Sequence, residues 1–439
     1  MRITQLVLEK VACFDRLTID FQNGRDPSKA DIHLIVGANG TGKSTVLIAL
    51  AQFFSQTKTG LEKRFAESNG LAVLQTEDQS HLISGRGRVD SSQYNSLFSI
   101  HPKEIAGTLR LFSRDERLFT YGMNSSLHIE AARLPPLSFA AFAYSGLRST
   151  AAFRLNAIQE QTENPLANAL NFDNPNASKD LIQWVANTKA KEAFARTRGD
   201  EIKADQRKES ITRIERIVSD IIDQPFGFIL NEDPLGILVE VDGKALDIEL
   251  LPDGLKSILS WAADLLMRLD RLPWENDIPV LDRPFLLFLD EIEVHLHPAW
   301  QRKILPAIQT LFPNAQIFVS THSPFVIASA DDAWIYPLTR KGRYSALDVP
   351  IPSMKGNSYA TILRDALGMD ASFSVELESL FDRFYQARDE ALGGNEAALS
   401  KMNMLQEELS AYGAEVSAVV VPEMRQTHRR LNRSKGDPQ

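Results

Sequence analysis

The chain has 439 residues, of which 44% are hydrophobic and 24% charged, so it can bury a large core and form two or three subdomains. Its net charge of −9 argues against a surface that coats nucleic acid uniformly. We expect no membrane span and no signal peptide, because no apolar run approaches about 20 residues and Met1 leads into an alternating strand. The single cysteine, Cys13, excludes an intrachain disulfide, and together these features predict a cytoplasmic protein.

A phosphate-loop pattern, G-x-x-x-x-G-K-[ST], follows an apolar run at residues 32–36 and precedes a helix-forming segment at residues 45–50. Glycines at such a turn let backbone N–H groups surround the β- and γ-phosphates, while Lys43 adds positive charge and Ser44 can ligate Mg²⁺. The alternative is a glycine-rich turn without a ligand, which motifs farther along the chain disfavour. The sequence therefore predicts an ATP and Mg²⁺ site formed by Gly37, Ala38, Asn39, Gly40, Thr41, Gly42, Lys43, Ser44 and Thr45.

A helical stretch is predicted over residues 178–223, and its basic side chains lie among acids. The basic residues are Lys189, Lys191, Arg196, Arg198, Lys203, Arg207, Lys208, Arg213 and Arg216. A nucleic-acid-binding patch is one interpretation, but the interspersed acids favour a solvated helical face. Residues 226–250 then alternate as strands and lead into the next motif.

The segment Leu251-Pro252-Asp253-Gly254-Leu255-Lys256-Ser257 opens an amphipathic helix that we expect to continue to Leu269. A helix N-terminus carries a partial positive charge and unpaired N–H groups, so an anion could dock there. We therefore count Gly254, Lys256 and Ser257 among the nucleotide-binding residues.

Two buried strands are predicted farther on, over residues 285–289 and 316–320, because both are continuous apolar runs typical of a parallel sheet. The first ends in Asp290-Glu291, which we assign to the metal and to activation of the attacking water, respectively. The alternative is an ordinary strand end with two solvated acids. The second strand is followed by His322, which could reach the γ-phosphate. Glu291, His322 and Lys43 are thus the predicted catalytic residues.

The order of these motifs resembles that of the ABC/SMC-type ATPases. The resemblance implies an α/β fold: a P-loop ATPase head with a mixed sheet core, a short helical insertion and a helical C-terminal tail. It also implies a homodimer or higher oligomer, in which the signature of one subunit closes over the nucleotide held by the other. One position departs from the family: Pro252 replaces a serine whose hydroxyl contacts the γ-phosphate. The family's glutamine-bearing loop has several candidates between Gln52 and Gln161.

A narrower resemblance rests on the string from Asp290 to Gln301, which is similar to the D-E-x-x-x-H-L-H-P-x-W-Q string of stand-alone bacterial defence ATPases. The first hairpin (residues 1–21) and residues 144–148 resemble segments of the same ATPases. Residues 356–368 resemble the Septu type, whose core the PARIS and OLD types share. In this family the string lies at the dimer seam. Zinc chelation by His295 and His297 is the weaker alternative.

The Septu resemblance implies an ATP-hydrolysing regulatory or sensor subunit of an antiphage system, which controls a separately encoded nuclease and could contact DNA or a phage component. A DNA-repair ATPase acting on DNA ends and a transport ATPase are the competing functions. The short insertion, in place of a long coiled-coil arm, and the net negative charge disfavour a repair ATPase. A transport ATPase is disfavoured because the helical insertion is unlike a permease-coupling domain and the glutamine-bearing loop is not evident. We expect no nuclease site in this chain.

Four regions are predicted along the chain. Residues 1–150 form the N-terminal half of the ATPase head, and residues 151–224 form a helical insertion. Residues 225–350 form the C-terminal half of the head with the signature, the acidic strand and His322. Residues 351–439 form a helical C-terminal region.

Overall fold

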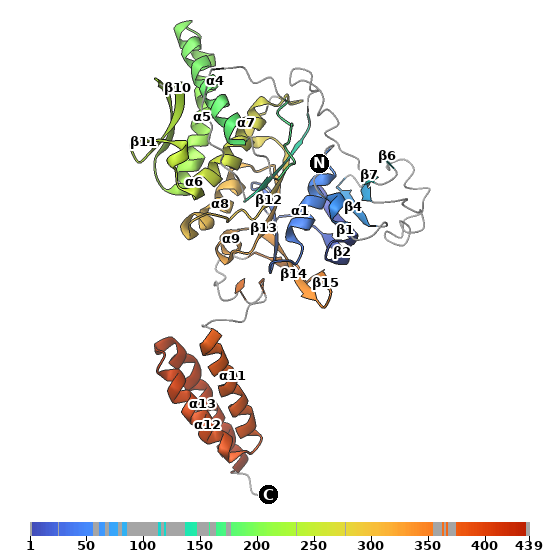
Figure 1. Cartoon of the computed structure of the whole chain (residues 1–439), viewed down its shortest axis with the longest axis vertical. Helices are drawn as coiled ribbons and strands as arrows, with labels where there is room; N and C mark the ends of the chain where they lie inside the picture. The colour runs from blue at the N-terminus through green and yellow to red at the C-terminus, as the bar shows by residue number, and fades with distance from the viewer. Residues whose placement is uncertain are drawn as a thin grey trace. The chain divides into compact units, whose positions relative to one another are not determined.

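The computed structural model describes the residues given at the end of this paragraph, and they fall into two compact units, Met1–Gly368 and Met369–Gln439 (Figure 1). The first unit contains the phosphate loop, and each unit is described separately below. Of the Tyr144–Arg148 motif, residues 147–148 lie outside the described residues, as does most of 356–368. The described residues are 2–24, 26–55, 61–65, 70–77, 81–85, 113–115, 118–119, 137–146, 158, 164–172, 177–233, 235–276, 278–353, 362–363, 366–367 and 375–435.

A mixed sheet forms the centre of the first unit, and five neighbouring strands of it, from β8 at one edge to β14, are parallel. These strands are continuous apolar runs because both faces of the sheet are covered. Alternate residues face two different cores: Leu34 and Leu287 point to one, Ile35 and Phe288 to the other. In order across the sheet the strands are β8 (Ala140–Ser145), β12 (Phe285–Asp290), β13 (Gln316–Thr321), β3 (Asp31–Gly37), β14 (Ala333–Lys341) and the antiparallel β15 (Tyr344–Leu347), with β16 (Ile351–Pro352) also paired to β14.

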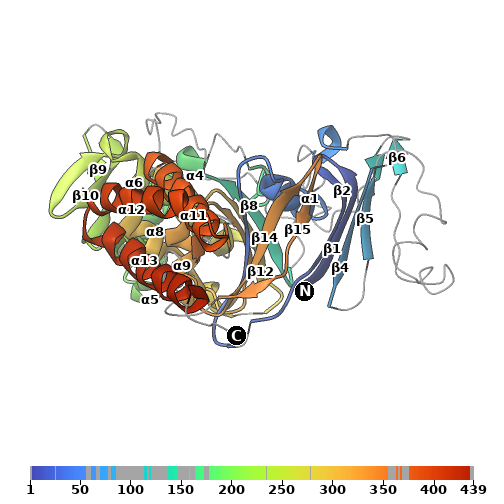
Figure 2. The same ribbon diagram turned by 90° about the horizontal axis from the view of Figure 1, so that it is seen from below.

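Helix α1 (Lys43–Gln52) and a second, antiparallel sheet cover one face of the central sheet (Figure 2). The phosphate loop joins β3 to α1, as the sequence predicts. The predicted α/β fold is thus confirmed. For residues 60–122 the sequence predicts irregular hairpins, and most of this segment lies outside the described residues. The strands that are described there pair with one another or with β1 in this sheet. Its strands are β2 (Phe14–Asp20), β1 (Ile3–Val11), β4 (Leu71–Thr76), β5 (His81–Gly85), β7 (Leu118–Phe119) and β6 (Ser113–Asp115).

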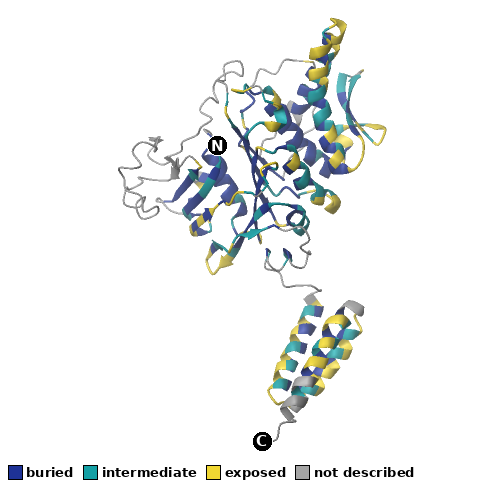
Figure 3. Cartoon of the chain, turned by 180° about the vertical axis from the view of Figure 1, so that it is seen from behind, coloured by how far each residue is buried: buried dark blue, intermediate teal, exposed yellow. Residues whose placement is uncertain are grey.

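Helices cover the opposite face, and Figure 3 shows that the sheet between the two layers is buried. Helix α5 buries one stripe, from Ile211 through Ile214 and Val218 to Ile221, at helical spacing. A π-helical turn, Leu259–Ala263, joins α6 to α7. The helices are α4 (Ala177–Thr197), α5 (Glu201–Ile222), α6 (Asp253–Ile258), α7 (Asp264–Arg271), α8 (Pro298–Leu311) and α9 (Pro324–Ser329), beside a small sheet of β9 (Phe226–Glu232), β10 (Leu235–Val241) and β11 (Lys244–Asp247).

Three helices make up the second unit: α11 (Val375–Leu392), α12 (Glu396–Ser410) and α13 (Ala414–Lys435). They share a small core of their own, to which Phe384, Met402 and Leu409 contribute fully buried side chains. Among the helices of the described part of the chain, none has the length and apolar character needed to cross a bilayer.

Candidate nucleotide-binding site

Three glycines of the phosphate loop have positive φ: Gly37 at 145°, Gly40 at 81° and Gly42 at 100°. A Cβ atom at Gly37 would overlap the carbonyl oxygen of Leu338, and one at Gly42 would overlap the ring of Phe14. At these two positions only glycine combines the backbone conformation with the available space. Gly40 faces open space, because no atom lies within 4 Å of the corresponding position. The loop is therefore closely packed at both ends and open in its middle.

Helix α1 begins at this loop without a side-chain cap, because its N-cap residue is Gly42, and its first turn contains no acidic residue. The first N–H groups of a helix have no partner within the helix, and the helix dipole adds a partial positive charge there. An anion bound in the loop would accept hydrogen bonds from these N–H groups and would be stabilised by the partial positive charge. The start of α1 thus has the features of a phosphate-binding helix N-terminus.

The ammonium group of Lys43 lies inside the curve of the loop. Its Nζ donates hydrogen bonds to the carbonyl oxygens of Gly37, at 2.9 Å, and Ala38, at 3.2 Å. Burial lowers the pKa of Lys43, and the nearby carboxylates of Glu291 and Glu293 oppose this shift. The side chain thus holds a positive charge at the position that a β- or γ-phosphate occupies in such a loop.

Ser44 and Asp290, the two predicted metal ligands, are in contact. Ser44 Oγ donates a hydrogen bond to Asp290 Oδ1 at 3.1 Å. Ser320, at the end of β13, donates to the same carboxylate oxygen and accepts from the backbone N–H of Glu291 at 2.9 Å. A hydroxyl and a carboxylate beside a phosphate site suit Mg²⁺, which binds one or two protein oxygens together with substrate phosphates.

Glu291 follows the acidic strand in a left-handed conformation, with φ 50°, which is uncommon for a residue with a side chain. Gly146, at the end of β8, packs against its carbonyl oxygen so closely that a Cβ atom there would overlap it. The N–H of Gly146 also donates to the carbonyl of Asp290 at 2.6 Å. The end of β8 therefore fixes the backbone that turns Glu291 away from the strand.

A buried carboxylate, that of Glu293, holds His322. Glu293 Oε1 accepts a hydrogen bond from the backbone N–H of His322 at 2.8 Å and lies 3.0 Å from its Nδ1. The Glu293 side chain is only 4% exposed and that of His322 is 51% exposed. Burial raises the pKa of Glu293, and the hydrogen bonds from His322 oppose this shift. The contact between Glu293 and His322 could not be read from their spacing in the sequence.

Two further polar residues of this region have contacts that the sequence does not reveal. Gln301, on α8, donates to the carbonyl of Leu296 at 2.9 Å and accepts from Ser323 Oγ at 2.6 Å. It thereby ties the segment after the acidic strand to the segment that carries His322. Ser320 bridges the predicted metal and water-activating acids, as described above. The only sequence signal for Ser320 is a hydroxyl at the end of an apolar strand.

The predicted signature residues lie at the start of α6, which packs on the helical face of the central sheet, whereas α1 packs on the other face (Figure 2). A Cβ atom at Gly254 would lie 2.6 Å from the carbonyl oxygen of His295, so glycine permits this close packing. Ser257 is buried, and Lys256 Nζ lies 3.5 Å from Asp253 Oδ1. Within one chain, the structure does not bring these residues to the phosphate loop.

The histidines after the acidic strand have structural contacts. His297 is the N-cap of α8, where its Nδ1 accepts from the N–H of Ala299 at 3.3 Å. His295 has φ 64°, and its carbonyl oxygen faces Gly254. Among the described residues no group of three His, Cys, Asp or Glu side chains is arranged to hold a metal ion.

Known proteins show similarity over most of the chain. The Septu protein PtuA of Bacillus thuringiensis is 24% identical over 399 residues, which is 88% of this chain and 89% of the relative. The retron Ec83 probable ATPase of Escherichia coli is 25% identical over 414 residues, covering 79% of this chain and 73% of the relative.

Among solved structures, a SmcHead bound to the C-winged helix domain of ScpA aligns with a TM-score of 0.45 and 16% identity over 80% of this chain and 98% of that one. The SMC head domain from Thermotoga maritima aligns with a TM-score of 0.39 and 15% identity over 80% and 99%, respectively.

A family model described as "AAA domain, putative AbiEii toxin, Type IV TA system" matches residues 32–328. This range contains the phosphate loop, the acidic strand and His322, whose geometry is given above. The chain therefore belongs to this family of AAA domains.

Proposed function

We propose that this chain is the ATP-binding and ATP-hydrolysing regulatory subunit of an antiphage defence system, and that it controls a separately encoded nuclease. One observation supports the ATPase part above all: Ser44 of the phosphate loop shares a hydrogen bond with Asp290, directly before Glu291. The similarity to a Septu protein over 88% of the chain supports the role in defence. In this proposal residues 1–150 and 225–350 form one ATPase head.

Each side chain then has a defined task. The loop N–H groups and Lys43 bind the β- and γ-phosphates, and Ser44 and Asp290 hold Mg²⁺, which would neutralise charge on the phosphate oxygens. Glu291 polarises the attacking water. His322, oriented by Glu293, contacts the γ-phosphate and reports its presence to the rest of the head.

The active assembly in this proposal is a dimer with two composite sites. The start of α6 and the phosphate loop lie on opposite faces of the sheet, so a second subunit is needed to bring Gly254, Lys256 and Ser257 to a nucleotide. Pro252 is the N-cap of α6 and makes no side-chain cap. Contact with the γ-phosphate would therefore come from backbone N–H groups and Lys256 in place of a serine hydroxyl.

The test begins with the purified chain, which should hydrolyse ATP and leave DNA and RNA intact. Proteins encoded beside it should co-purify, and mass spectrometry would identify them. Adding the partner should produce a nuclease whose activity depends on the nucleotide. Metal-dependent cleavage by this chain alone, lost on substitution outside the ATP site, would overturn the proposal. Stimulation of hydrolysis by DNA ends without any partner would favour a repair ATPase.

A further inference from the structure

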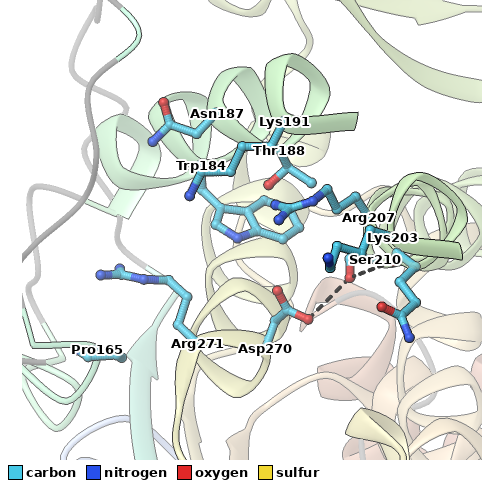
Figure 4. Close-up of a pocket in the computed structure, with 11 residues that line it drawn as sticks. Pro165, Trp184, Asn187, Thr188, Lys191, Lys203, Arg207, Ser210, Asp270 and Arg271 are labelled. Atoms are coloured by element: carbon cyan, nitrogen blue, oxygen red, sulfur yellow. Dashed lines mark hydrogen bonds between the residues drawn. The ribbon is translucent and has the colours of Figure 1, made fainter. Parts of the chain in front are cut away.

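A cavity of about 560 Å³ lies between helices α4, α5 and α7 (Figure 4). Its walls include Trp184 and Lys191 from α4, Arg207 from α5, and Asp270 and Arg271 at the end of α7. Because α4 and α7 pack on the helical face of the central sheet and α1 on the other, this cavity is separate from the phosphate loop. Its volume falls within the range of small-molecule sites, roughly 300–1,000 Å³.

Positive charge is concentrated in this cavity. Four basic side chains line it, Lys191, Lys203, Arg207 and Arg271, against the single carboxylate of Asp270, although the whole chain has a net charge of −9. Lys203 and Arg207 are four residues apart on α5, a spacing at which like charges destabilise a helix. An anion between them would remove that repulsion.

Arg207 is the basic group best placed to take a ligand. Lys203 already pairs with Asp200 at 2.8 Å, at the start of α5. Arg207, by contrast, makes no hydrogen bond or ion pair with the residues described in this structure, and it is half-buried in the cavity wall. A guanidinium group offers a planar fork of donors that matches phosphate oxygens.

The other walls suit an organic group as well as a phosphate. Asn187 and Thr188 are buried polar residues of α4 that line the cavity, and Trp184 and Pro165 add apolar surface. Figure 4 shows the indole of Trp184 between Arg207 and Asp270. Nine of the eleven lining residues are polar or charged, and the two apolar ones, Trp184 and Pro165, supply the surface on which a ring would pack.

Asp270 is the one group that opposes an anion. It is open to the cavity, and it accepts a hydrogen bond from Ser210 Oγ at 3.1 Å. The surrounding atoms of α5 and α7 raise its pKa by desolvation, and the Ser210 hydrogen bond and the nearby arginines Arg283, Arg213 and Arg207 oppose the shift. Neutralising this side chain should therefore strengthen anion binding.

We propose that this basic cavity binds a small phosphorylated molecule of the nucleotide class, with Arg207 on the phosphate and the Trp184 wall beside the base. It is a second ligand site, independent of the one at the phosphate loop. Its ligand would bind to the helical insertion, on the face of the sheet opposite α1.

The experiment is isothermal titration calorimetry in the Lys43→Ala background, which removes binding at the phosphate loop. The probes are AMP, inorganic phosphate, pyrophosphate and a short oligo(dT). We expect saturable, one-site binding of AMP, with inorganic phosphate weaker. Arg207→Ala should weaken AMP binding at least about tenfold, and Asp270→Asn should tighten it.

The matched control is Lys208→Ala, an exposed cation next to Arg207 that lies outside the cavity lining, and it should leave the affinity for AMP unchanged. Alanine favours helices, so folding of these α5 variants should be retained, which thermal melting would verify. AMP binding that is insensitive to Arg207→Ala, or no saturable AMP binding at millimolar concentration, would overturn the proposal. Preference for oligo(dT), or equal affinity for pyrophosphate and AMP, would overturn the assignment to a mononucleotide.

Discussion

At the scale of single residues, the proposed function assigns charge clamping and water activation to different side chains. Lys43 lies inside the loop, whereas Glu291 follows the strand that ends in Asp290, the proposed metal ligand. Lys43→Ala should therefore abolish ATP binding. Glu291→Gln should preserve binding and slow hydrolysis by about 10²–10⁴-fold, the usual contribution of a general base. Fluorescent-nucleotide titration and phosphate release would measure the two effects, and a Glu291→Gln enzyme with wild-type turnover would refute the assignment.

The contact between Glu293 and His322 leads to a second prediction at this scale. If Glu293 positions His322 as proposed, Glu293→Gln, which keeps an acceptor for the His322 N–H, should lower kcat about tenfold and change KM little. His322→Ala should lower kcat by at least as much. Because the two act through one contact, the double variant should be no slower than His322→Ala alone, as a double-mutant cycle of steady-state rates would show. Additive losses would mean that Glu293 acts independently of His322.

At the scale of elements, a buried polar cluster joins β1 to the central sheet at the end opposite the phosphate loop. Asp31 pairs with Arg2 and lies 3.5 Å from His33, and Gln316 exchanges hydrogen bonds with the backbone of Ile3 at 2.7 and 2.9 Å. Burial alone would raise the pKa of Asp31, but His33 and Arg2 outweigh it, so the pKa lies below its ordinary value of 3.8. The charged carboxylate is therefore favoured by folding.

Acid should weaken this junction. A group whose pKa is lowered by folding stabilises the protein above its unfolded pKa, and the stabilisation disappears as pH falls through the folded value. The contribution of Asp31 should thus be complete above about pH 4 and be lost below it. Urea unfolding at several pH values should show a shallower acid decline for Asp31→Asn than for the wild type, once its lower stability at neutral pH is subtracted. Parallel pH curves would rule out Asp31 as the source.

These elements also show how far the sequence could go. The strands over residues 285–289 and 316–320 were predictable because a continuous apolar run has few alternatives in a parallel sheet. The loop between β3 and α1 was predictable because only glycine fits at Gly37 and Gly42. The bridging role of Ser320 could not be predicted, because it depends on the register between β12 and β13, which no local pattern encodes. The basic cavity could not be predicted either, because its charged side chains come from three helices whose packing no local pattern encodes.

At the scale of the whole molecule, the central sheet separates the two halves of the proposed catalytic site. The phosphate loop and α1 belong to the core on one face, and α6 belongs to the core on the other. If each site is completed by a second subunit, nucleotide binding and dimerisation are linked, so ATP should raise the dimer fraction. Glu291→Gln, which retains ATP, should accumulate dimers in analytical ultracentrifugation, and Lys43→Ala should stay monomeric under the same conditions.

Sites made from two subunits can be tested by mixing variants. Gly254 is a poor position to alter, because a side chain there would collide with the carbonyl of His295 within the same chain. Lys256→Glu is better: within the described part of the chain Lys256 forms its ion pair with the neighbouring Asp253, so its loss should affect the partner's nucleotide far more than the fold. Lys43→Ala and Lys256→Glu should each be inactive alone. In a mixed dimer, one site combines an intact loop with an intact signature and the other contains both defects, so mixing should restore up to half of the activity per dimer. If Lys256→Glu alone hydrolysed ATP at the wild-type rate, or if the mixture stayed inactive while forming dimers, catalysis across the subunit interface would be excluded.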